Sequence, residues 1–269
     1  MLTRRRLLGN SAALALLAAA SGRGLADDGS CDHGPLPDSS KFESGDLLWP
    51  KKRDIYVPYA AGSRRGFDAE REQWEKERDA FVREVSVRPD ASDYERQVAA
   101  GLKRMTFAEF HSRYTTGLEA DTITPYGSGV PGVGHVAIVE RDPNGNLFVI
   151  DAMPDPGVAR LSYADWLGKR PCELVWHGRV DGVAAALREK LAEEAKRQLG
   201  KPYSFWNFKL DDDSGFYCSK LVWLSVMRAA SLAIDGDTNP LRKFWLSPKQ
   251  LLYAQPVVRL HNPADYRAK

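Results

Sequence analysis

Two β-rich segments joined by a turn motif limit the possible folds more than any other feature of the chain. Residues 134–141 (GHVAIVER) and 147–152 (LFVIDA) are rich in β-branched and apolar side chains, which favour strands. The segment between them contains Asn144-Gly145, a dipeptide typical of the tight turn in a β-hairpin. The sequence therefore predicts a β-hairpin and, with it, an antiparallel sheet.

Other segments carry local signals of their own. Residues 184–199 have the amphipathic pattern of a helix, and Gly200 stands where a helix commonly stops. Residues 217–232 (YCSKLVWLSVMRAASL) predict an apolar helix that begins at Cys218. The remaining expected elements are a turn at 44–46 followed by a short strand up to residue 50, short strands at 54–59 and 173–180, a helical turn at 163–167, and a short helix followed by a strand in 247–260.

Residues 67–118 differ from the rest of the chain in composition. Within them, residues 70–85 are highly charged, lack Gly and Pro, and place their few apolar side chains on one helical face. Ser92 and Glu95 match the capping box that starts a helix. The block predicts a helical insertion in a domain that spans 42–269, after an irregular Gly-, Pro- and Ser-rich segment at 27–41.

Residues 1–26 have the three parts of an export signal. A basic run at 4–6 precedes an apolar stretch at 7–20, and small residues up to Ala26 resemble a signal peptidase site. Residues 3–8 (TRRRLL) also resemble the twin-arginine signature. The apolar stretch is shorter than the roughly 20 residues that span a bilayer. We therefore expect a cleaved signal and a bacterial periplasmic or extracellular protein without stable membrane insertion; the alternative is an uncleaved anchor.

The charge balance argues against nucleic acid as a partner. The whole chain has 38 Lys+Arg and 36 Asp+Glu, a formal net charge of +2. Residues 1–26 contain four arginines and no acidic residue, so the remaining chain carries a net charge of −2. A nucleic-acid-binding domain usually has a basic surface, which this balance does not predict.

The three cysteines leave at least one thiol unpaired. Cys31 and Cys172 could form a disulfide in an oxidising compartment, which leaves Cys218. Cys218 follows a Gly-containing loop and opens a helix, where the helix N-terminus favours the nucleophilic thiolate. The alternative is a small buried core residue, a common role of free cysteine.

His135 and an acidic residue of the hairpin complete a possible catalytic set. His135 follows a Gly-rich loop and begins a strand, where a neutral imidazole can take a thiol proton, although a structural histidine is the alternative. Asp151, in the second strand, can orient the imidazole if the register puts both on one face. Glu140 competes for this role, but strand alternation points it to the opposite face.

Several motifs occur in an order that resembles a known family. SGDLLWP, GHVAIV, VIDA, LGKPY, FYCSKLVW and SPKQLL resemble the circularly permuted papain-like hydrolases of the NlpC type, in the YiiX/YebB-like branch. In that branch the His strand precedes the Cys helix, as His135 precedes Cys218. The resemblance does not cover residues 67–118. It implies an α+β papain-like fold, with an antiparallel sheet packed against the helix of the catalytic cysteine and a helical insertion.

The resemblance also implies roles for individual residues. Cys218 would be the nucleophile, His135 the base and Asp151 the third member, although relatives often have the longer Glu at that position. Tyr203 and Tyr217 would bind substrate or the oxyanion. The expected activity is that of an exported cysteine peptidase or amidase that cleaves peptidoglycan stem peptides through a thioester.

Two other functions stay open at this point. One is a lipid or ester hydrolase or acyltransferase on the same fold, which a large apolar groove beside Cys218 would favour over a polar cleft of peptide width. The other is an inactive envelope binding protein. We expect no cofactor and no metal, because no His/Cys cluster is present and the acidic run 211–213 lacks the spacing of a calcium loop. The sequence does not define the oligomeric state.

Overall fold

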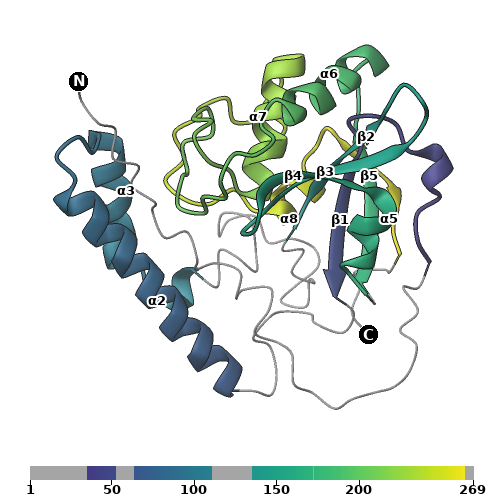
Figure 1. Ribbon diagram of the computed structural model, residues 1–269. Helices are drawn as coiled ribbons and strands as arrows, with labels where there is room; N and C mark the ends of the chain where they lie inside the picture. Colours follow the sequence, from purple (N-terminus) through teal and green to yellow (C-terminus); the bar gives the residue numbers. More distant parts are fainter. Residues whose placement is uncertain (1–34, 53–63, 111–134, 172, 264–269) are drawn as a thin grey trace, which may run out of the picture.

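A single antiparallel sheet forms the centre of the protein. The computed structural model describes residues 35–52, 64–110, 135–171 and 173–263. In these residues, six strands pair antiparallel in the order β4-β3-β2-β1-β5-β6 (Figure 1). The strands are β1 (Leu47–Lys52), β2 (Ala137–Arg141), β3 (Leu147–Met153), β4 (Gly157–Ser162), β5 (Glu173–Val180) and β6 (Val257–His261). The predicted export signal, Cys31, Cys172 and the strand at 54–59 lie outside the described residues.

The predicted hairpin is confirmed, and its loop length sets the register. β2 and β3 pair Arg141 with Leu147 and Ile138 with Ile150. Gly145 has a φ of 84°, the left-handed region that glycine adopts without strain. Continued beyond the strand, this register puts His135 level with Met153 and so on the same face as Asp151, two residues along.

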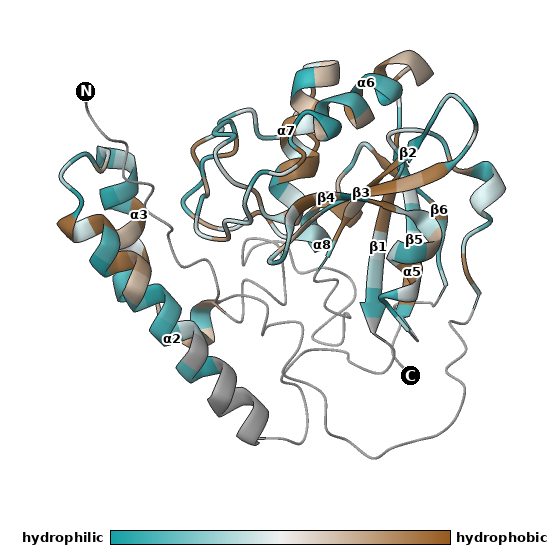
Figure 2. Ribbon diagram, viewed as in Figure 1, coloured by the Kyte–Doolittle hydropathy of each residue, from teal (hydrophilic) through white to brown (hydrophobic). Residues whose placement is uncertain are grey.

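Helices cover both faces of the sheet. On one face, α6 (Ala185–Lys196) and α7 (Cys218–Ala230) share a large apolar core with the sheet. On the other face, α5 (Tyr163–Gly168) packs over a smaller core that contains Trp166, Ala137 and Val149. Because both faces of β2 and β3 are buried, these strands read as nearly continuous apolar runs, which are brown in Figure 2.

The helix that starts at Cys218 is apolar nearly all round. Leu221, Val222, Trp223 and Leu224 are all buried, as expected for a helix enclosed by neighbouring elements. Burial of each such side chain stabilises the fold by about 1.5–3 kcal/mol. The helix is therefore a rigid support for the cysteine at its first position.

Two helices within residues 64–104 lie beside the sheet domain (Figure 1). They are α2 (Arg64–Val87) and α3 (Asp93–Arg104), and the capping box predicted from Ser92 and Glu95 is present at the start of α3. The Phe81 ring stacks on Trp206 with centroids 5.7 Å apart, and the Tyr94 hydroxyl donates to Arg242 O at 2.6 Å. These contacts join the two helices to the rest of the protein.

The sequence did not reveal every element. β4, at the edge of the sheet, was not predicted, and the short 3-10 helix η1 (Ser39–Lys41) interrupts the segment expected to be irregular. β4 begins at Gly157, whose φ is 94° and whose Cα lies so close to Lys201 O that a side chain would clash. α8 (Pro248–Leu252) and β6 match the predicted C-terminal helix and strand. Among the described residues, no helix is both long and apolar enough to cross a membrane.

Candidate active site

His135 and Asp151 form a direct ion pair. His135 lies two residues before β2, and its Nε2 is 2.5 Å from Asp151 Oδ1 in β3. The Asp151 side chain is fully buried, whereas the His135 side chain is 20% exposed. The imidazole therefore lies between the protein interior and a surface from which a reactant can approach.

The second carboxylate oxygen of Asp151 has two donors of its own. Trp166 Nε1 donates to Asp151 Oδ2 at 2.9 Å, and an Arg170 guanidinium nitrogen donates to the same oxygen at 2.8 Å. Burial by itself raises the pKa of Asp151, but the charges and hydrogen bonds of His135, Arg170 and Trp166 outweigh it and lower the pKa. The carboxylate is ionised and its orientation is fixed.

Cys218 completes this set at the first turn of α7. Its side chain is buried and in no disulfide, and it lies close enough to His135 to raise the pKa of the imidazole. Because Nε2 faces Asp151, Nδ1 is the ring nitrogen left for the sulfur. Burial lowers the pKa of His135, but the negative charges of Asp151 and Cys218 outweigh burial and raise the pKa to about 10. The imidazole can therefore keep its proton at neutral pH, as an ion pair with a thiolate requires.

Glu140, the other candidate for the third position, is engaged elsewhere. Its carboxylate is 2.5 Å from Arg160 Nε and 3.0 Å from Lys196 Nζ. In the observed register, Glu140 and Asp151 have opposite parity along the hairpin, so they point to opposite faces. The structure thus places Asp151, and not Glu140, against His135.

The two tyrosines differ in their surroundings. Tyr203 forms a β-bridge with Phe216, two residues before Cys218, and its side chain is partly exposed. Tyr217 is fully buried, and its hydroxyl accepts a hydrogen bond from the Leu246 N–H at 3.4 Å. Tyr217 therefore packs in the core, and Tyr203 is partly exposed and could meet a substrate. For both tyrosines, binding of substrate or the oxyanion stays a prediction.

Tyr203 is one of the residues that line a groove, and Cys218 is not among them. The groove has a volume of about 550 Å³ and lies between the helices α2 and α3 and the segment 203–214. Its lining is partly aromatic and partly charged, and Phe205, one of its residues, also contacts the Tyr217 ring at 6.2 Å. The aromatic residues that line it are Phe81, Tyr94, Tyr203, Phe205, Trp206 and Phe208.

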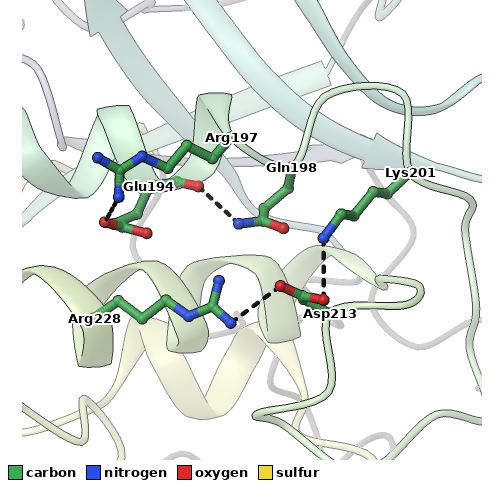
Figure 3. A pocket seen from close by; sticks show the side chains of 6 residues that line it. All are labelled: Glu194, Arg197, Gln198, Lys201, Asp213 and Arg228. Atoms are coloured by element: carbon green, nitrogen blue, oxygen red, sulfur yellow. Dashed lines mark hydrogen bonds and ion pairs between the residues drawn. The ribbon is translucent and has the colours of Figure 1, made fainter.

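The acidic run 211–213 is balanced by cations of the same chain. Asp213 pairs with Lys201 at 3.2 Å and with Arg228 at 3.1 Å, and Figure 3 shows both side chains pointing to it. The hollow in this figure contains none of the three residues Cys218, His135 and Asp151. Within the described part of the chain, no group of three or more His, Cys, Asp or Glu side chains could hold a metal ion.

Arg170 and Trp166 were not found by sequence reasoning. Trp166 lies in α5, and Arg170 lies two residues after the end of α5, in a segment with no recognisable motif. A single arginine in such a segment looks like an ordinary surface residue. Only the three-dimensional structure shows that both side chains converge on Asp151.

Comparison with known proteins gives the family. Residues 114–258, more than half of the chain, match the family described as permuted papain-like amidase enzyme, YaeF/YiiX, C92 family. The uncharacterized protein YiiX of Escherichia coli K12 is 40% identical over 70 residues, which are 26% of this chain and 33% of YiiX. The crystal structure of the metalloprotein yiiX from Escherichia coli O157:H7 resembles the fold with a TM-score of 0.44 and 17% identity, over 81% of this chain and 96% of that chain. The chain thus spans about a third of the curated relative that it matches, and it belongs to the permuted papain-like amidase family.

Proposed function

We propose that this protein is an exported cysteine amidase, related to the NlpC-type enzymes, that cleaves an amide bond in peptidoglycan stem peptides. Cys218 is the nucleophile, His135 the base and Asp151 the residue that orients His135. One observation carries this proposal: His135 is hydrogen-bonded to a buried carboxylate and lies close enough to an unpaired thiol for both groups to raise its pKa. This is the arrangement of nucleophile, base and orienting group that acyl transfer requires.

The first half of the reaction forms a thioester. The Cys218 thiolate attacks the amide carbonyl carbon, and the negative charge moves to the carbonyl oxygen. The free N–H groups in the first turn of α7 can donate to this oxyanion. The C–N bond then breaks, the His135 imidazolium gives its proton to the leaving amine, and Asp151 holds the ring in place.

The second half releases the acyl group. His135, now neutral, takes a proton from a water molecule, whose oxygen attacks the thioester carbonyl. The C–S bond breaks, the carboxylic acid product leaves, and the thiolate and imidazolium are restored. A second amine in place of water would give acyl transfer by the same steps.

The groove beside Tyr203 supports a peptide more than a lipid. Its lining combines aromatic rings with polar side chains, among them Glu84, Glu95, Asn207 and Asp212. An acyl chain would take these groups out of water, which is costly even for carboxylates that pair with a neighbour such as Arg88, whereas a peptide offers backbone donors and acceptors. The signal-like residues 1–26 support export to the envelope, where peptidoglycan is the abundant peptide amide.

The test is mass analysis of purified peptidoglycan after incubation with the enzyme. Wild type should release peptide fragments that carry a new carboxylate and a new amine, and Cys218→Ser should release none. Ser225→Ala serves as the matched control, because its hydroxyl is buried in the same helix and bonds only Leu221 O at 2.7 Å within that helix. If wild type and Cys218→Ser release the same fragments, the proposal is wrong. If the enzyme leaves peptidoglycan intact and instead releases fatty acid from an acyl ester, the substrate is an acyl ester and not a stem peptide.

A further inference from the structure

Four groups of alternating charge lie in a row from the protein interior to the thiol. Arg170 contacts Asp151 Oδ2, His135 contacts Asp151 Oδ1, and Cys218 lies close enough to His135 to act on its pKa. When the thiol is ionised and the imidazole is protonated, the four charges sum to zero. Without Arg170 the same state would bury a net negative charge, which protein interiors strongly disfavour.

We propose that Arg170 is a positioning residue for the reaction: it keeps Asp151 ionised and aimed at His135, and thereby maintains the thiolate–imidazolium pair of Cys218 and His135. The inference rests on the proposed function, because it assigns a role within the same set of residues.

The structure fixes Arg170 on several sides. Its side chain is only 7% exposed, and it donates from its other terminal nitrogen to Trp166 O at 2.9 Å. The guanidinium also stacks over the Trp166 ring at 4.3 Å from the centroid. Trp166 Nε1 donates to the same oxygen as Arg170, so Trp166 in α5 contacts both the arginine and the carboxylate. A lysine could supply the charge but neither the fork of donors nor the stacking.

Among the described residues that act on His135 and Asp151, Arg170 has no charged substitute that could balance the Asp151 carboxylate. The groups that act on His135 are Asp151 from β3 and Cys218 from α7, and Arg170 acts on Asp151 from beyond α5. Tyr217, which precedes α7, also faces Cys218, but burial strongly raises its pKa and keeps it neutral. Arg170 is therefore the cation that balances the buried carboxylate.

The rate of Cys218 alkylation by iodoacetamide, measured against pH, tests the inference without knowledge of the substrate. The modified peptide is quantified by mass spectrometry, so that Cys31 and Cys172 do not contribute. In Arg170→Gln we expect the acid limb of the rate profile to move about one unit to higher pH, which makes alkylation about tenfold slower on that limb. Arg170→Lys, which keeps the charge, should recover at least half of this shift.

Arg160→Gln is the matched control, because Arg160 also pairs with a buried carboxylate of the hairpin, Glu140, on the opposite face. It should leave the profile unchanged. If Arg170→Gln matches this control, or if Arg170→Lys shifts as much as Arg170→Gln, the role given to the charge of Arg170 is wrong. If wild-type Cys218 reacts no faster than Cys218 in His135→Ala, the proposed function itself fails.

Discussion

Asp151 and Glu140 are the two buried carboxylates of the β2–β3 hairpin, yet only one of them contacts His135. Asp151→Ala removes the group that orients the imidazole and stabilises its positive charge. We expect the hydrolysis rate to fall about 10²- to 10⁴-fold, as for the orienting residue in other triads. Steady-state kinetics on the released peptide measures this loss.

Glu140→Ala is the control for this substitution. It removes a carboxylate that pairs with Arg160 and Lys196 on the face away from His135, so it should change the rate less than about threefold. Equal losses in both variants would show that the hairpin, and not the contact with His135, determines the rate.

Lys220 gives a prediction about stability at the same scale. It follows Cys218 by two positions and is fully buried, with its ammonium 3.4 Å from Asn207 O. Burial lowers its pKa to about 7, although Asp212 and its acidic neighbours act in the opposite direction. An unfolded lysine keeps its proton to about pH 10.4, so between these values the unfolded chain binds more protons and stability rises with pH.

The rise attributable to Lys220 is roughly 2 kcal/mol between pH 7 and 9. Lys220→Met should remove that part of the pH dependence in urea unfolding curves. The exposed Lys190, in α6, supplies the control variant Lys190→Met, which should keep the wild-type slope. If both variants have the wild-type slope, Lys220 is not the group that titrates.

Single residues were predictable where a local pattern marked them. Cys218 and His135 stand at the start of a helix and near the start of a strand, and the sequence shows both boundaries. Asp151 depended on a register that the sequence left open, and the five-residue loop at 142–146 decides it. Arg170 was out of reach, because its contact with Asp151 joins residues 19 positions apart with no periodic relation.

At the scale of the elements, a substitution in the hairpin turn should destabilise the fold although the turn is exposed. Gly145 has a φ of 84° and no neighbouring atom that a side chain would meet, so the cost of Gly145→Ala is backbone strain alone. We expect the variant to lose about 1 kcal/mol of unfolding free energy in urea. Gly101→Ala, in the open interior of α3, should instead gain up to about 1 kcal/mol. Opposite signs identify the left-handed turn; the same sign in both would contradict it.

Elements were predictable in proportion to the strength of their local signals. The hairpin has a turn dipeptide and α8 has a proline at its start, and both are found; the helix predicted at 184–199 is found as α6, which ends at Lys196, before the glycine expected to stop it. β4 has no such pattern: it is an edge strand with mixed side chains, and its Val158 is hydrogen-bonded with the backbone of Gly200 and Lys201. Its position comes from pairing with β3, which no short window of sequence displays.

For the whole molecule, strand order was the least predictable feature. β1 lies between β2 and β5, although about 85 residues separate it from β2 in the chain. Closing such a long loop costs little more entropy than closing a short one, so the insertion of α2 and α3 does not prevent the pairing. The consequence is spatial: a segment distant in sequence forms one wall of the groove that Tyr203 also lines.

That wall gives the last prediction. If the groove binds the substrate, Phe81→Ala should weaken binding, because the Phe81 ring lines the groove and stacks on Trp206 while Cys218 is untouched. We expect KM for a peptidoglycan fragment to rise about tenfold with little change in kcat, since the lost contact serves ground state and transition state alike. Val87→Ala, at the exposed end of α2, is the control and should leave both constants at their wild-type values. An unchanged KM in Phe81→Ala, or a fall in kcat alone, would mean that the substrate reaches Cys218 by another path and that α2 contributes only to folding.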